Sequence, residues 1–253
     1  MEEVIKVSNL TRKYKDFSLG PVDLSFPKGF ATALIGANGA GKTTLVKLLC
    51  GFYYPTEGNI KLNGHEISEY NIEEYYSLIS AVFQDIYLLP VTIAEFVSSS
   101  ENEIDREKVT DVIRQAGLED KVKAIPNGID SKLMKGVFDD SIEMSGGEKQ
   151  KLMLARALYK DAPIIVLDEP TAALDPIAEN KLYLKYSELT ANKTSVYISH
   201  RLASTRFCDR IIYLENGSIV ECGTHDELMK LDGKYAYMFD VQSHYYKEDA
   251  ENA

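Results

Sequence analysis

A glycine-rich segment between a short apolar run and a helical pattern constrains the fold of this chain more than any other feature. Residues 31–35 (ATALI) predict a buried strand, because the run is short, apolar and ends at Gly36. Residues 36–43 (GANGAGKT) follow directly and match the pattern GxxxxGK[ST]. Apolar residues then recur at helical spacing from Leu45 to Phe52. This order predicts a phosphate-binding loop at the carboxyl end of a parallel strand.

The predicted loop supplies the groups that a nucleoside triphosphate needs. Glycines let backbone N–H groups surround phosphate oxygens, and the start of the next helix adds a partial positive charge. Lys42 is expected to reach the β- and γ-phosphates, and the Thr43 hydroxyl to ligate Mg²⁺. The predicted nucleotide-binding residues of this segment are Gly36, Asn38, Gly39, Gly41, Lys42, Thr43 and Thr44. Kinases, GTPases and helicases share such a loop, so it predicts triphosphate binding without naming an activity.

The remaining patterns predict an α/β fold. Residues 164–167 and 194–199 are short β-rich runs, and Asn216 with Gly217 joins two more as in a β-hairpin. Strands that alternate with helices predict a mostly parallel sheet. We predict a P-loop NTPase core of this kind, with an N-terminal antiparallel β part and an inserted helical lobe. The expected organisation is one domain at 1–246 (core about 1–86 and 161–233, helical lobe about 87–160, C-terminal helix about 234–246) and a flexible tail at 247–253.

Composition narrows the classes of function. The formal net charge is −11, which disfavours binding to nucleic acid, so no nucleic-acid partner is expected. Cys50, Cys208 and Cys222 lack the spacing of a zinc site or a disulfide framework. No apolar run approaches the roughly 20 residues of a membrane helix. A link to a membrane is therefore expected to use another segment or subunit.

Two further motifs carry candidate chemistry. Asp168 and Glu169 end the run at 164–167; Asp168 is placed to hold Mg²⁺ and Glu169 to act as general base on a water molecule. Two acids that merely cap a strand are the alternative, which the phosphate loop in the same chain disfavours. Ser145 and Glu148 form a capping-box pattern around two glycines. A capping box alone does not explain Gly146 and Gly147, whereas exposed N–H groups at a helix start suit a phosphate.

With these motifs in place, the chain resembles the ABC (ATP-binding cassette) ATPase family along nearly its whole length. The segments that carry the resemblance lie in the family's order: the phosphate loop at 36–43, then VFQD at 82–85, MSGGEKQ at 144–150, DEPTAALD at 168–175 and ISHR at 198–201. Residues 83–93 (FQDIYLLPVTI) are similar to exporter-type members in particular.

The resemblance implies a head-to-tail dimer of two such domains that traps two ATP molecules. Ser145, Gly146 and Gly147 of one domain would meet the γ-phosphate held by the other, and Asp175 would link the two sites. The implied catalytic residues are Glu169, His200, Gln84 and Lys42, and the implied metal-binding residues are Thr43, Gln84 and Asp168. Tyr14 is the best candidate for stacking on adenine, with Phe17 as the alternative, although either ring could instead belong to the core.

Three details depart from the family's pattern. Met144 and Glu148 replace the usual Leu and Gln. Glu148 brings a negative charge near the expected phosphate, and either the capping geometry or Lys149 is expected to offset it. Within residues 137–141, only Asp139 matches an acidic loop of exporter-type members.

The implied function is an ATP-binding and ATP-hydrolysing subunit or domain that drives export through a transmembrane partner at the cytoplasmic face of the membrane. The second cassette could be an identical chain or a different one. A soluble ABC ATPase in a cytosolic assembly is the first alternative; the acidic charge and the lack of a long coiled coil between the phosphate loop and Ser145 argue against it. A non-catalytic adaptor is the second, and Glu169 and His200 argue against that.

Overall fold

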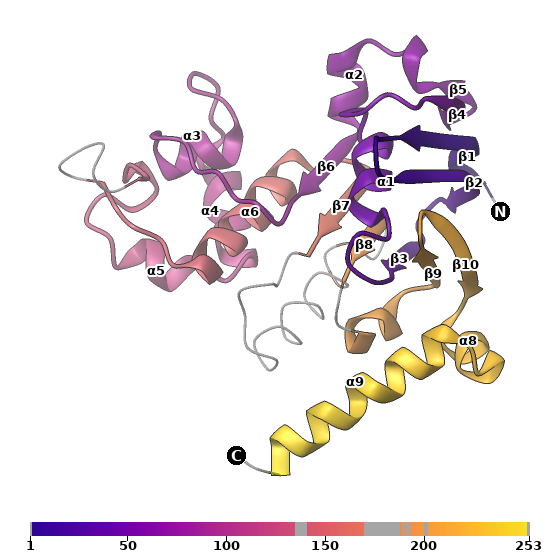
Figure 1. Cartoon of the computed structure of the whole chain (residues 1–253). Coiled ribbons are helices and arrows are strands. Elements are labelled where there is room, and N and C mark those ends of the chain that lie inside the picture. Colours follow the sequence, from indigo (N-terminus) through magenta and orange to yellow (C-terminus); the bar gives the residue numbers. More distant parts are fainter. Residues whose placement is uncertain are drawn as a thin grey trace. The chain divides into compact units, whose positions relative to one another are not determined.

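The computed structural model describes residues 2–134, 141–169, 188, 190, 193–199 and 202–251 (Figure 1). The chain divides into two compact units. The first contains residues 2–79, 163–169 and the described residues from 188 onward, and the second contains 80–134 and 141–162. The predicted helical lobe at about 87–160 falls inside the second unit, which starts earlier, within a strand.

The first unit begins with an antiparallel sheet in the order β2-β1-β4-β5. Its strands are β1 (Glu3–Lys13), β2 (Ser18–Pro27), β4 (Glu57–Leu62) and β5 (His65–Glu66). Alternate residues of β1 and β2 are buried, including Ile5, Val7, Leu24 and Phe26, as expected for a sheet with one face on the core. This is the antiparallel N-terminal part that the sequence predicts.

A second, mostly parallel sheet has the strand order β10-β9-β3-β8-β7-β6. Its strands are β3 (Ala31–Ile35), β6 (Ile79–Val82), β7 (Ile164–Asp168), β8 (Thr194–Ile198), β9 (Arg210–Glu215) and β10 (Ser218–Gly223). β3 pairs in parallel with β8 and β9, β7 pairs in parallel with β8, and β10 pairs antiparallel to β9. Parallel pairing places the carboxyl ends of β3, β7 and β8 at one edge, where ligands bind in such folds.

Helices complete the first unit. They are α1 (Lys42–Leu49), η1 (Ile67–Glu69), α2 (Ile72–Ser77), η3 (Leu202–Phe207), α8 (His225–Leu231) and α9 (Lys234–Glu251). α9 extends to Glu251, past the predicted end at 246, into the segment expected to be a flexible tail. Among the described helices, none combines the length and apolar character needed to cross a lipid bilayer.

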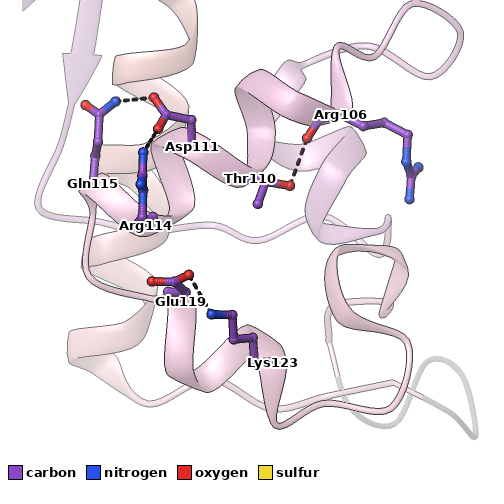
Figure 2. Close-up of polar contacts among 7 residues, drawn as sticks. All are labelled: Arg106, Thr110, Asp111, Arg114, Gln115, Glu119 and Lys123. Carbon is purple, nitrogen blue, oxygen red and sulfur yellow. Dashed lines mark hydrogen bonds and ion pairs between the residues drawn. The ribbon is translucent and has the colours of Figure 1, made fainter.

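The second unit is mostly helical, as predicted. It contains α3 (Ile93–Ser98), α4 (Arg106–Gln115), α5 (Glu119–Lys123), η2 (Gly128–Asp130) and α6 (Gly146–Lys160). α6 packs against α3 and α4, and Val109, Val112 and Ile113 form the buried face of α4. Figure 2 shows the outer faces of α4 and α5, where charged side chains pair with one another within each helix.

Candidate functional site

The phosphate loop leaves the buried end of β3 through a conformation that only glycine tolerates. Gly36 has φ 142°, and a Cβ at this position would lie 2.1 Å from the carbonyl oxygen of Leu214 on β9. Gly39 has φ 78°, and nothing lies within 4 Å of its missing Cβ. The first glycine is therefore required by close packing against the sheet. The second faces open space, as expected for a loop that surrounds a ligand.

Lys42 is held inside this loop. Its side chain is buried, and its ammonium donates to the carbonyl oxygens of Gly36, at 2.8 Å, and Ala37, at 3.0 Å. Burial lowers the pKa of Lys42, and the carboxylates of Glu169 and Asp168 oppose that shift. α1 begins after Gly41, which supplies no side-chain cap. The first N–H groups of α1 therefore stay available to an anion beside a positive charge.

Asp168 carries the clearest sign of an absent partner. This residue ends β7 and is 3% exposed, and its Oδ1 has no hydrogen-bond partner among the described residues. Its carboxylate is also hydrogen-bonded to Thr43. Burial raises the pKa of Asp168, the Thr43 bond lowers it, and Glu169 raises it further. A cation at the free oxygen would remove this conflict, so Thr43 and Asp168 fit the predicted Mg²⁺ site.

The described part of the chain contains no cluster of three or more His, Cys, Asp or Glu side chains that could hold a metal by itself.

Glu169 follows Asp168 in a backbone conformation that is uncommon for a non-glycine residue. Its φ is 50°, and its N–H donates to the carbonyl oxygen of Ile198 at the end of β8, at 3.0 Å. The ends of β7 and β8 are thus tied together beside the loop that follows β3. Strained backbone of this kind is concentrated at functional sites, and it turns Glu169 out of the strand direction.

Tyr14 has the exposure that an adenine-stacking ring requires. Its side chain is 42% exposed, and its ring is stacked on that of Phe17 with 6.3 Å between the ring centroids. Phe17 is partly buried, and its ring lies 3.0 Å from the position that a Cβ on Gly41 would occupy. Between the two aromatic candidates, Tyr14 therefore presents the accessible ring, and its role stays a prediction.

Ser145, Gly146 and Gly147 lie in the second unit, where they start α6. Ser145 caps the helix: its hydroxyl accepts from the N–H of Glu148 at 3.3 Å, and Glu148 Oε2 accepts from the N–H of Ser145 at 2.8 Å. This is the predicted capping box. Ser145 and Gly146 are exposed, and the N–H groups of the first helical turn have no earlier carbonyl in the helix to bond. The turn is thus open to an external anion.

Four other residues were singled out by the sequence. Gln84 is exposed two residues after β6, and its role at the metal stays a prediction. His200 and Asp175 lie outside the described residues, as does Asp139.

Two cations near the loop were not predicted from the sequence. The guanidinium of Arg12 lies 5.3 Å from the centre of the Tyr14 ring and donates to the carbonyl oxygen of Tyr54 at 2.8 Å, so it supports Tyr14 from the protein side. Lys47, one turn after Thr43 on α1, lowers the pKa of Asp168. The i, i+4 spacing from Thr43 to Lys47 is the sequence signal that could have indicated this neighbour.

Comparison with known proteins agrees with this geometry. Residues 19–172 match the model of the ABC transporter family. An ATP-dependent lipid A-core flippase of Cupriavidus pinatubonensis is 39% identical over 228 residues, which cover 89% of this chain and 38% of the relative. The flippase of the same name from Ralstonia nicotianae is 40% identical over 228 residues, with the same coverage.

Among solved structures, a bacterial Atm1-family ABC exporter with ATP bound matches with a TM-score of 0.85 at 30% identity. The match covers 95% of this chain and 42% of that structure's chain. The present chain therefore spans about two fifths of the length of the exporters that it matches.

Proposed function

Because the chain belongs to the ABC transporter family, we propose that it is the ATPase that drives a membrane exporter. In this proposal two such domains close on two ATP molecules, and hydrolysis allows them to separate. The cycle moves a transmembrane partner, which carries the surface that binds the cargo. ATP can drive this motion because it binds the closed dimer more tightly than the open one.

In this proposal, residues of the first unit bind ATP and carry the general base. The loop N–H groups and Lys42 bind the phosphates, and Tyr14 stacks on adenine. Thr43 and Asp168 would hold Mg²⁺, which would supply positive charge to the phosphate oxygens. Glu169 accepts a proton from the attacking water, at the edge where the ends of β7 and β8 meet. Gln84, from the second unit, would contact the metal or the water, and His200 would contact the γ-phosphate.

The second half of each site comes from another cassette. Ser145 and Gly146 are exposed, and the turn that they form with Gly147 offers a helix N-terminus to an anion. It would meet the γ-phosphate on the partner domain, with Asp175 joining the two sites. Each chain carries both halves, which supports a homodimer and equally suits one member of a heterodimer.

A groove in the second unit is the observation that carries the transport part of the proposal. A cavity of about 320 Å³ lies between the segment after Gln84 and the segment before Ser145. Its lining residues are Ile86, Tyr87, Leu88, Met134, Ile142, Glu143, Met144 and Lys149. Tyr87 is 81% exposed. A partner helix that placed an apolar side chain here would touch both a predicted ATP-sensing segment and the start of α6, which supports coupling of partner motion to ATP.

The relatives favour transport over the soluble alternative, since they are named as flippases and an exporter. We place the domain at the cytoplasmic face of a membrane, held there by its transmembrane partner. The lipid in the relatives' name says nothing about a cargo site on this domain, because we expect cargo to bind to the transmembrane partner.

The proposal is tested by purifying the tagged chain from detergent-solubilised membranes of its native host and identifying associated proteins by mass. We expect a multi-spanning membrane protein at equal stoichiometry, which Tyr87→Ala removes. Tyr237→Ala is the matched control, since Tyr237 is an exposed tyrosine on α9 of the other unit. Recovery with soluble partners only would contradict the exporter role and leave the ATPase assignment in place.

A further inference from the structure

An ion pair joins α5 to the turn that starts α6. Nζ of Lys121 lies 3.1 Å from Oε1 of Glu148, while Oε2 of the same carboxylate accepts from the N–H of Ser145 at 2.8 Å. Both oxygens of Glu148 therefore have a partner, one in the turn and one on a separate helix. Lys121 belongs to none of the motifs that carry the family resemblance.

The Lys121–Glu148 pair balances a negative charge that lies where the phosphate is expected to bind. Glu148 stabilises the positive end of α6, yet the same negative charge opposes a phosphate at the same place. Partial burial acts to raise the pKa of Glu148, but the bond from Ser145 and the Lys121 ammonium hold it below its usual value. The carboxylate thus stays ionised at neutral pH, so its charge must be balanced by a cation rather than removed by a proton.

Glu119, one of two acids at the start of α5, forms its ion pair with a different lysine and not with Lys121. Glu119 accepts from Lys123 at 2.6 Å, one turn along the same helix, as Figure 2 shows. The Lys121 and Glu148 side chains are 38% and 24% exposed, whereas Lys123 is 70% exposed. Lys121 is therefore the better shielded cation, and Lys123 is a matched lysine that does not share its partner.

We propose that Lys121 is a positioning residue for ATP hydrolysis: it balances the charge of Glu148 and so lets the turn of Ser145 to Gly147 accept the γ-phosphate of ATP on a second copy of the chain. The inference rests on the proposed function, in which this turn meets ATP across the dimer. Lys121 acts through Glu148 and does not itself touch ATP.

A double-mutant cycle on the whole chain tests the proposal through the KM for ATP and kcat. We expect Lys121→Met to raise KM by roughly twofold to fivefold, as expected for loss of a partly exposed ion pair. Lys123→Met is expected to change KM by less than roughly twofold, as expected for an exposed pair remote from the turn. In a Glu148→Gln background, Lys121→Met should have no further effect, because a glutamine can still cap Ser145 and leaves no charge to balance.

Two readouts separate this role from a merely structural one. Lys121→Arg should restore the parental KM, and the melting temperatures of Lys121→Met and Lys123→Met should agree. The effect of Lys121→Met should also shrink at high salt, since the pair is partly exposed.

An equal rise in KM for Lys121→Met with and without Glu148 would overturn the inference, as would a KM no different from that of Lys123→Met. In both cases an active parent would leave the proposed function standing. A parent chain without Mg²⁺-dependent ATP turnover, alone or with its membrane partner, would overturn the proposed function and the inference with it.

Discussion

Asp168→Asn is expected to stabilise the ligand-free chain while weakening its response to Mg²⁺ and ATP. Asp168 is buried with Oδ1 unpaired among the described residues, so its negative charge has no full set of partners until a metal binds. Asparagine has nearly the same shape and can still accept from Thr43. The substitution removes the unbalanced charge and, with it, the ligand that the metal needs.

The size of the effect follows from the environment of the carboxylate. A buried polar atom without a partner costs about 1–3 kcal/mol, and more when it is charged; asparagine keeps one unpaired atom but removes the charge. Because burial raises the folded pKa of Asp168 above the ordinary 3.8, stability falls as the pH rises from 3.8 through the folded pKa, and it stays lower above that pH. Loss of attraction to Lys42 offsets part of the gain, so we expect a net gain of about 1 kcal/mol, the low end of that range. For a chain of this size, that raises Tm by roughly 2–4 °C.

Urea unfolding at pH 8, with and without Mg²⁺ and ATP, is the assay. With Mg²⁺ and ATP at 100 times Kd, the parent should gain about 2.7 kcal/mol. Asp168→Asn should gain less, and its response should not depend on Mg²⁺. Asp209→Asn is the control, since Asp209 already accepts from the N–H of Ala31 at 2.8 Å and should be neutral or destabilising when changed. If, in the absence of Mg²⁺ and ATP, Asp168→Asn were less stable than the parent, the charge of Asp168 would not destabilise the ligand-free chain.

Three further changes have defined outcomes. Gly36→Ala should destabilise the chain by roughly 3 kcal/mol or more, seen as a lower urea midpoint, because its Cβ would meet the carbonyl of Leu214. Tyr14→Ala should weaken ATP binding by about 1–3 kcal/mol in calorimetry, while Tyr14→Phe keeps the parental affinity; equal losses would argue against stacking. Burial lowers the pKa of His225, with Arg206 adding to the effect, so stability from its neutral form is lost as pH falls below the ordinary 6.5. His225→Phe should flatten that decline in Tm between pH 7.5 and 5.5.

Local signals made much of the fold predictable. The run at 31–35 coincides with β3, because an apolar segment bounded by glycine leaves few alternatives. The spacing of Ser145 and Glu148 correctly predicted a capping box, because both of its hydrogen bonds form within one helical turn. The end of the C-terminal helix was misplaced: α9 runs to Glu251 because residues 247–251 (KEDAE) contain no glycine or proline to stop it.

Contacts between distant segments were not predictable from local pattern. The sequence flagged the charge of Glu148 but not its partner, because Lys121 reaches it only once α5 packs near the start of α6. The contact of Arg12 with the Tyr14 ring could not be predicted from spacing or composition, because it depends on the backbone conformation at the end of β1. The motif order predicted Asp168 near Thr43, yet only the structure shows that one of its oxygens is left unpaired.

The proposal that two chains share each ATP is best tested by the molar mass of Glu169→Gln in solution, measured by light scattering with Mg²⁺ and ATP. Removal of the general base should stop turnover and trap ATP between two chains. We predict twice the mass of a single chain with ATP and the mass of one chain without it. Adding Ser145→Arg should return the mass to that of one chain, because arginine blocks the turn that meets the γ-phosphate. A variant that binds ATP yet stays a single chain at every concentration would contradict the shared-site dimer.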